Sequence, residues 1–307
     1  MSIFLAILTY FGYVFVVTMY TVKAVKYLRR PRHLRWDLYP VMHEERYRYG
    51  GSYYEDIGGA AGARKKHRLR GILFLLKEYV TMGEYFKRRK TYWLALYPWH
   101  VGFMLIIAFH IFTFFAAVVM LAGVPVSAGS PFAAGRIFYY VVLFMGVVSF
   151  ASGIVGSIGV AVKRLTASDL RDYATPQNYF TYAFCLAVFL SGFYAWYFVD
   201  PTFSEYRQFW VGLITWKPIM VAPAATLHIV LFDLFLIYLP FTRSMHYITR
   251  IFAFLFIRWD DEPNLRGSRL ESRLMSQLGQ KVTWGAAHIK SGGTWADQVA
   301  EQNGGAP

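Results

Sequence analysis

The sequence contains almost no cysteine: Cys185 is the single one among 307 residues. An iron–sulfur cluster takes four cysteine ligands, and a c-type heme needs a Cys-x-x-Cys-His attachment motif. Neither centre can therefore be held by this chain. Any iron–sulfur cofactor with which it works must belong to a partner.

Charged residues are also scarce, at 16% of the chain against 56% hydrophobic residues. They fall in blocks, and five nearly uncharged stretches between these blocks are long enough to cross about 30 Å of hydrocarbon. The composition therefore predicts an all-α integral membrane protein with five transmembrane helices. The expected spans are Ile3 to Val22, Leu94 to Val126, Ile137 to Val162, Tyr179 to Val199, and Val221 to about Phe241.

The first apolar stretch lacks the features of a removable signal peptide. No basic residue precedes it and no small-residue cleavage site follows it. We expect it to remain as the first span.

Acidic residues number only 18 against 32 Lys and Arg, and the basic residues are unevenly placed. Residues 23–90 hold 18 of them, whereas Arg136, Arg207 and Lys217 alone fall in the loops of the opposite side. Cytoplasmic loops are rich in Lys and Arg, so we expect the N-terminus outside and the C-terminus in the cytoplasm. The charge borders membrane spans, so we expect no nucleic acid as a partner, and anionic membrane lipids at the basic run 64–70.

Four histidines lie within or next to the apolar stretches: His100 and His110 in the second, His228 and His246 in or just after the fifth. An imidazole in hydrocarbon is costly without a partner, and two spaced pairs on two helices can hold two hemes. At 100° per residue, the 18 residues from His228 to His246 make five full turns, so one α-helix would present both on one face.

The pairing of the histidines follows from depth in the membrane. The second span runs outward and the fifth inward, so we expect His100 with His246 at an inner heme and His110 with His228 at an outer heme. Each pair would give bis-imidazole ligation of a heme b, which leaves no open axial position and suits electron transfer. The alternative is that each histidine is a buried or interfacial hydrogen-bonding residue.

Other polar residues near the histidines each have two possible roles. Arg243 and Arg250 flank His246 and could pair with heme propionates, or they could be ordinary anchors at the cytoplasmic side. Asp233 is an intramembrane carboxylate that could relay protons or be bonded to a neighbouring helix. A zinc hydrolase is not indicated, because no His-Glu-x-x-His helix occurs.

The chain thus divides into four expected parts. Residues 1–22 form the first transmembrane helix, and residues 23–93 a cytoplasmic loop with a surface helix from Gly71 to about Lys90. Residues 94–250 form a four-helix membrane domain with hemes held between its second and fifth spans. Residues 251–307 form a cytoplasmic C-terminal tail.

The histidine spacings of ten and eighteen, on five spans with the N-terminus outside, resemble the gamma (cytochrome b) subunit of respiratory nitrate reductases. A longer first inner loop resembles one branch of that family, the diheme membrane subunits of redox complexes of sulfate-reducing bacteria. The residues that carry this narrower resemblance are His33-Leu34-Arg35-Trp36-Asp37-Leu38-Tyr39-Pro40-Val41, His43-Glu44 and Gly50-Gly51-Ser52-Tyr53.

The resemblance implies a function that composition alone does not. Members of that branch lie in the bacterial cytoplasmic (inner) membrane next to a cytoplasmic iron–sulfur protein similar to heterodisulfide reductase. It implies a subunit of a quinone-linked oxidoreductase complex that carries two heme b groups and exchanges electrons with menaquinone.

The resemblance also directs attention to a quinone site. In the nitrate reductase relatives a lysine in the loop after the second span helps to bind quinone near the outer heme. Here that loop offers Arg136, our first candidate, with Lys217 as the second. Asp200 or Glu205 could accept protons at the outer face. The alternative for all four is a solvated loop charge.

Two other functions fit parts of the sequence. One is a heme-free membrane anchor that docks a soluble redox enzyme through the loop 23–93 and the C-terminal tail. The other is a transporter whose histidines relay protons, although the chain shows neither an inverted repeat nor paired broken helices.

Overall fold

The computed structural model describes residues 2–29, 68–246 and 266–303. The chain forms two compact units, one of Met1–Met19 with Leu76–Thr242 and the other of Tyr20–Leu75 with Arg243–Pro307. The loop residues 33–53, the basic residues 64–67 and Arg250 lie outside the described residues, so the predictions made on them stay predictions.

The predicted all-helical class is confirmed for the described residues, which form helices, turns and two isolated β-bridges. Five helices are long and apolar enough to cross a membrane, as expected of a multi-pass membrane protein. Their bounds are α1 Ser2–Arg29, α4 Lys90–Leu121, α5 Ala133–Thr166, α7 Pro176–Phe198 and α9 Pro223–Tyr238.

The helix expected before the second span is present in two pieces, while its place at the membrane surface stays a prediction. They are α2 Arg68–Thr81 and α3 Gly83–Arg88, and between them Met82 adopts a left-handed conformation with φ of 49°. Such a residue ends a helix, so the chain changes direction there. The indole of Trp93, on the first turn of α4, donates to the carbonyl of Thr81 over 3.0 Å and so ties α4 to the end of α2.

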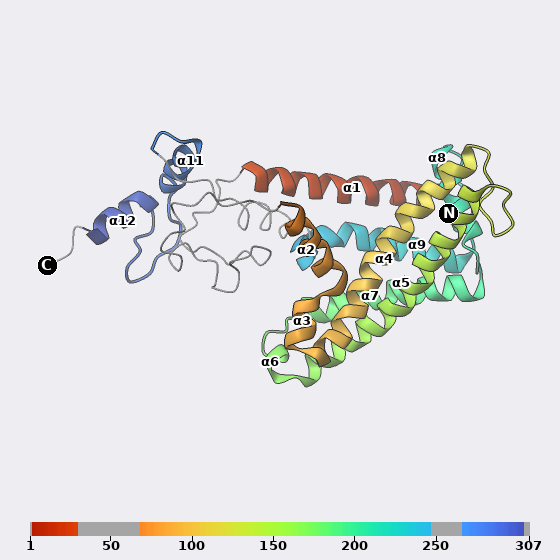
Figure 1. Ribbon diagram of the computed structural model, residues 1–307, viewed down its shortest axis with the longest axis horizontal. Coiled ribbons are helices and arrows are strands. Elements are labelled where there is room, and N and C mark those ends of the chain that lie inside the picture. Colours follow the sequence, from red (N-terminus) through yellow and green to blue (C-terminus); the bar gives the residue numbers. More distant parts are fainter. Residues whose placement is uncertain (1, 30–67, 247–265, 304–307) are drawn as a thin grey trace. The chain divides into compact units, whose positions relative to one another are not determined.

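Glycines let α4 and α5 pack closely along much of their length (Figure 1). A Cβ atom on Gly102 would lie 2.5 Å from the Cα atom of Gly153, and one on Gly156 would meet the backbone of Trp99. Small residues at such positions allow helix backbones to approach in a membrane. The glycine spacing of the third span therefore serves helix packing.

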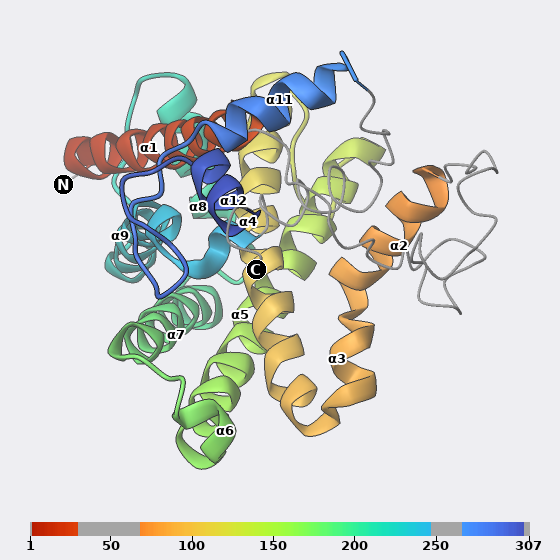
Figure 2. The same cartoon turned by 90° about the vertical axis from the view of Figure 1, so that its left-hand side faces the viewer.

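The remaining spans continue the bundle from α5 to α7 and from α7 to α9. The short helix α6, Ser168–Arg171, lies in the connection between α5 and α7 (Figure 2). The connection between α7 and α9 contains α8, Ser204–Ile214, whose residues Tyr206, Phe209 and Trp210 are buried and which packs against α4.

The N-terminal half of α1 is held to this bundle by polar contacts. The Thr9 hydroxyl lies 2.7 Å from the Asp233 carboxylate of α9, and the Tyr10 hydroxyl donates to the carbonyl of Leu213 over 2.6 Å. Tyr13 packs edge-on against Trp210. The carboxylate of Asp233 was expected either to relay protons or to bond to a neighbouring helix. It is hydrogen-bonded to Thr9 of α1.

The fifth span ends earlier than the histidine geometry required. After Tyr238 the chain forms a 3-10 turn, η2 Leu239–Phe241, an extended residue at Thr242, and a second turn, η3 Arg243–Met245. The expectation of one α-helix from His228 to His246 is therefore wrong. Pro240 explains the change, because proline lacks an N–H donor and its ring clashes with the preceding turn of an α-helix.

In the second unit, residues 266–303 of the predicted tail are folded. They contain α11, Arg269–Leu278, and α12, Trp295–Asn303. The side chain of Gln298 accepts from the backbone N–H of Lys290 over 2.8 Å and donates to its carbonyl over 3.0 Å. These bonds hold α12 against the turn that precedes it.

Candidate functional site

Two histidines from different spans come together in the middle of the first unit. His110 lies on α4 and His228 on α9, and their side chains are buried, with 1% and 5% of their surface exposed. Their ring centroids are 5.7 Å apart and the ring planes differ by 22°. The structure thus brings together the two residues that were expected to form the outer pair.

The Nδ1 atom of each imidazole is already bonded. Nδ1–H of His228 donates to the carbonyl of Val188 and to the hydroxyl of Ser191 on α7, each at 3.2 Å. Nδ1 of His110 is hydrogen-bonded to the hydroxyl of Tyr206 on α8. A carbonyl can only accept, so the proton of His228 lies on Nδ1 and its Nε2 carries a free lone pair.

The Nε2 atoms differ from the Nδ1 atoms in lacking a hydrogen-bond partner within the described part of the chain. Both Nε2 atoms, of His110 and of His228, are buried and have no hydrogen-bond partner among the described residues. Buried nitrogen atoms of this kind are rare, because leaving one unsatisfied costs about 1–3 kcal/mol. One nitrogen fixed by an outer partner and the other left open is the arrangement of an imidazole that ligates a metal.

The spacing of the two rings fits one shared metal ion. An imidazole nitrogen binds a first-row metal at about 2 Å, so two rings on opposite sides of one ion have centroids roughly 6 Å apart. The 5.7 Å between His110 and His228 is close to that separation. Two buried imidazoles with open Nε2 atoms are the donor type of a bis-imidazole iron, but the ring of Phe232 lies stacked on that of His110 with centroids 3.4 Å apart and would also have to move.

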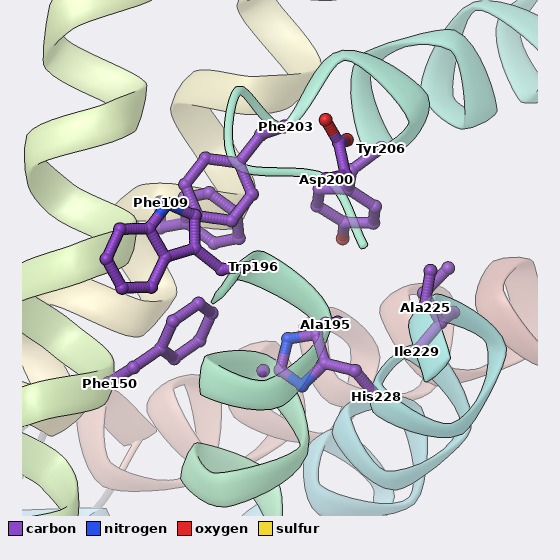
Figure 3. Close-up of a pocket in the computed structure, with 11 residues that line it drawn as sticks. Phe109, Phe150, Ala195, Trp196, Asp200, Phe203, Tyr206, Ala225, His228 and Ile229 are labelled. Atoms are coloured by element: carbon purple, nitrogen blue, oxygen red, sulfur yellow. The ribbon is translucent and has the colours of Figure 1, made fainter. Parts of the chain in front are cut away.

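Aromatic rings surround the pair. A cavity of about 30 Å³ lies next to His228, and the rings of Phe109, Phe150 and Phe203 line it (Figure 3). A Cβ atom on Gly192 would meet the Phe150 ring and lie 2.8 Å from Cε1 of His228. A macrocycle needs far more room than this cavity, so these aromatic side chains would have to turn aside to admit it.

The two histidines of the expected inner pair, His100 and His246, belong to different compact units. His100 lies on α4, half-buried, and its Nδ1 donates to the carbonyl of Leu96 over 2.9 Å. His246 belongs to the second unit, is exposed, and its Nδ1 donates to the carbonyl of Arg243 over 2.7 Å. Their pairing stays a prediction, as does the propionate role of Arg243, while Arg250 lies outside the described residues.

The two candidate quinone-site cations lie at the surface. Arg136 is in the first turn of α5 and donates to the carbonyl of Ser130 over 2.6 Å. It lines a surface groove of about 420 Å³ formed by α5 residues. Lys217 follows α8 and is exposed. The hydrogen bonds to His110 and His228 come instead from α7 and α8.

The two candidate proton acceptors have different surroundings. Both carboxylate oxygens of Asp200 cap α8, accepting from the backbone N–H groups of Ser204 at 2.9 Å and Glu205 at 2.7 Å. Glu205 uses only Oε1, which accepts from the N–H of Ala222 over 2.7 Å. Its Oε2 is buried and has no partner among the described residues.

Sequence reasoning missed the contribution of α8. Tyr206 was not singled out, yet its hydroxyl contacts His110, and burial raises the pKa of Tyr206 well above its ordinary value, so it stays neutral. Arg207 is 3% exposed, and burial lowers its pKa, while the charge of Asp200 raises it. Asp200 followed by Ser204 and Glu205 is a helix-start signal that could have located α8, but nothing marked Tyr206.

Comparison with protein families, curated proteins and solved structures finds no match to the chain.

Proposed function

We propose that the chain is a diheme cytochrome b subunit of a quinone-linked oxidoreductase complex in the bacterial cytoplasmic membrane. It exchanges electrons between the menaquinone pool and a cytoplasmic iron–sulfur subunit similar to heterodisulfide reductase. The observation that carries the proposal is the buried pair His110 and His228, each with its Nδ1 bonded and its Nε2 open.

The chain's own residues have separate tasks at the outer heme. His110 and His228 would hold the iron through Nε2, and Val188, Ser191 and Tyr206 fix the ring orientations through Nδ1. Backbone and hydroxyl partners of this kind set both the tautomer and the basicity of a ligating imidazole. When bound between these two histidines, a heme would supply one-electron transfer.

The inner heme rests on sequence arguments. His100 and His246 would be its ligands, and Arg243 and Arg250 would pair with its propionates. The support is the depth argument together with the basic residues that crowd the expected cytoplasmic side. Because α9 ends at Tyr238 and η2 follows it, His246 is not carried by the α-helix of His228.

The test is a heme count on the chain purified from membranes. We expect a b-type dithionite-reduced minus oxidised spectrum and two hemes per chain. Substitutions His110→Ala and His228→Ala each remove a ligand of the outer heme, so each variant is expected to retain one heme. His288→Ala, in the C-terminal segment, is the matched control and is expected to keep both.

The result that overturns the proposal also identifies its rival. A well-folded chain without heme would leave the heme-free anchor as the function. In that case the His110→Ala variant would assemble with the partner enzyme as well as the wild type does.

A further inference from the structure

The tautomer of His110 depends on where its hydrogen-bond partner, Tyr206, sends its own proton. A neutral imidazole that holds a metal through Nε2 carries its proton on Nδ1, so Nδ1–H of His110 must donate to the hydroxyl oxygen of Tyr206. If Tyr206 donated to Nδ1 instead, the proton of His110 would lie on Nε2, and that nitrogen could not bind a metal. The hydroxyl proton of Tyr206 therefore needs an acceptor other than His110.

Three aromatic side chains next to Tyr206 cannot be that acceptor. The rings of Phe109 and Phe209 stack on the Tyr206 ring, with centroids 5.6 Å and 6.1 Å away, and neither carries a polar atom. The ring of Trp210 lies 6.4 Å away, but an indole N–H can only donate.

Helix α1 supplies a suitable acceptor, Tyr13. Its hydroxyl is buried and has no hydrogen-bond partner among the described residues, so its oxygen is open to accept. Tyr13 packs edge-on against Trp210 with ring centroids 5.2 Å apart, and it interacts electrostatically with Tyr206. A tyrosine hydroxyl can accept one hydrogen bond and donate another, so Tyr13 needs an acceptor in its turn.

A buried carboxylate lies near both tyrosines. Asp233 of α9 is 1% exposed and interacts electrostatically with Tyr13 and with Tyr206. Its Oδ2 accepts from the hydroxyl of Thr9 over 2.7 Å, which ties the carboxylate to α1 one turn before Tyr13. A carboxylate can accept about four hydrogen bonds, so Asp233 has room for a second donor from α1.

We infer that Tyr13 and Asp233 position the ligand His110 through Tyr206, in one directed hydrogen-bond network; this rests on the proposed function. Nδ1–H of His110 donates to Tyr206, and the Tyr206 hydroxyl donates to Tyr13. The Tyr13 hydroxyl in turn donates to the carboxylate of Asp233. A carboxylate behind a ligating imidazole fixes its tautomer and raises its basicity, and here two tyrosines extend that arrangement. The first span thereby gains a task at the outer heme.

The first test is a redox titration of the heme-loaded Tyr13→Phe chain, in which the outer heme is the one that His110→Ala removes. Phenylalanine keeps the ring and removes the hydroxyl, so Tyr206 loses its acceptor and accepts less strongly from His110. The imidazole then stabilises the oxidised iron less. We expect oxidised iron to be held about tenfold more weakly relative to reduced iron, within the 10–100-fold range for such outer partners. For one electron, tenfold raises the midpoint potential by about 59 mV.

Tyr10→Phe is the matched control, because it removes a hydroxyl of the same helix that donates to the carbonyl of Leu213 instead. We expect this variant to keep the wild-type potential. Tyr206→Phe removes the direct partner of His110, so it is expected to raise the potential at least as far as Tyr13→Phe does. Equal shifts in Tyr10→Phe and Tyr13→Phe would mean that Tyr13 only helps to seat α1.

A double-variant cycle separates the network from a through-space effect of the Asp233 charge. Asp233→Asn keeps an oxygen that can accept from Tyr13 but carries no charge, so we expect the potential to rise. If Asp233 acts through Tyr13, combining the two substitutions shifts the potential no further than the larger single shift. Additive shifts would show that Asp233 acts on the heme directly and would overturn its place in the network. Should Tyr13→Phe not fold, Tyr206→Phe replaces it in the same cycle.

Other outcomes also overturn the inference. These are an unchanged or lowered potential in Tyr13→Phe, and the same result in Tyr206→Phe. The heme count is taken first, so a well-folded chain without heme counts against the proposed function. A heme-loaded chain whose potential does not respond to Tyr13 counts against this network alone.

Discussion

At the scale of single residues, the sequence predicted that His110 and His228 form a pair, but it did not predict their hydrogen-bond partners. The depth of a residue in the membrane follows from its position along an apolar run. Two histidines at matching depths could therefore be predicted to pair. The partners Ser191, Val188 and Tyr206 come from other helices, and which side chains face each other depends on helix rotation. A backbone carbonyl such as that of Val188 has no sequence signature at all.

Ser191→Ala tests whether the Nδ1 partners tune a bound heme. The alanine removes one of the two acceptors of His228 Nδ1–H and leaves the carbonyl of Val188. A less polarised imidazole stabilises the oxidised iron less, so we expect the midpoint potential of the outer heme to rise. A hydrogen bond is worth ~0.5–1.5 kcal/mol, so the rise is roughly 20–60 mV for one electron.

The measurement is a redox titration of the purified chain without added quinone. Ser157→Ala removes a buried hydroxyl of α5 that bonds the carbonyl of Gly153 instead, and it serves as the matched control. A potential that stays fixed in Ser191→Ala, or moves equally in both variants, would remove Ser191 from the heme's surroundings.

At the scale of helices, long apolar runs were easy to predict and their interruptions were not. Each of the five spans was expected, because twenty apolar residues leave the chain no other way to satisfy its backbone in hydrocarbon. Pro240 does indicate an interruption of the fifth helix. The spacing of His228 and His246 favoured one continuous α-helix, and that prediction is wrong. The left-handed Met82 carried none, since methionine is a good helix former and its conformation comes from the contacts around it.

Gly156→Ala tests the close packing of α4 on α5. The added Cβ would meet the backbone of Trp99, which cannot move aside as a flexible side chain can. We expect destabilisation of about 1–3 kcal/mol, the usual cost of overpacking. The measurement is the thermal unfolding temperature of the detergent-purified chain. Gly129→Ala, where a Cβ meets nothing within 4 Å, should leave it unchanged.

The start of α12 has a built-in pH dependence. The backbone N–H and the hydroxyl of Thr294 both donate to the exposed carboxylate of Asp297, each over 2.7 Å, and these bonds lower the pKa of Asp297. A carboxyl whose folded pKa lies below its unfolded value stabilises the fold above the unfolded pKa, about 3.9 for Asp. That contribution is lost as the pH falls through the folded pKa.

Hydrogen exchange of residues 295–303 measures this contribution against Asp297→Asn, which accepts hydrogen bonds but does not ionise. We expect greater protection in the wild type than in the variant at neutral pH. The difference should disappear well below pH 4, where both side chains are neutral. Equal protection at every pH would show that the charge of Asp297 adds nothing to the cap.

At the scale of the whole chain, charge and hydropathy predict the number of spans, and charge alone predicts their orientation. Five helices of the described residues are long and apolar enough to cross a membrane, as the sequence predicts. The folded segment 266–303 was not expected, because its helices are short and polar and gain their stability from capping and from Gln298. The bonds of Gln298 leave no sequence signature, whereas leucines recur every four residues in the sequence of α11 and could have indicated that helix.

Orientation can be tested with the help of the single cysteine. Cys185 is buried at 2% exposure, so Cys185→Ser yields a chain without thiols and should not disturb the surface. Into that background we place one thiol at either end, by Ser2→Cys or by Ser291→Cys. The excess of Lys and Arg in residues 23–90 predicts that the N-terminus is outside and residue 291 is in the cytoplasm.

A membrane-impermeant maleimide then reads the two positions. In right-side-out vesicles we expect label on the Ser2→Cys chain alone, and in inside-out vesicles on the Ser291→Cys chain alone. The reverse pattern would invert the depths of all four histidines together: His110 and His228 would still meet, because their contact does not depend on direction, but their heme would face the cytoplasm. By the proposed function, protons from a quinol oxidised at that heme would then be released inside the cell.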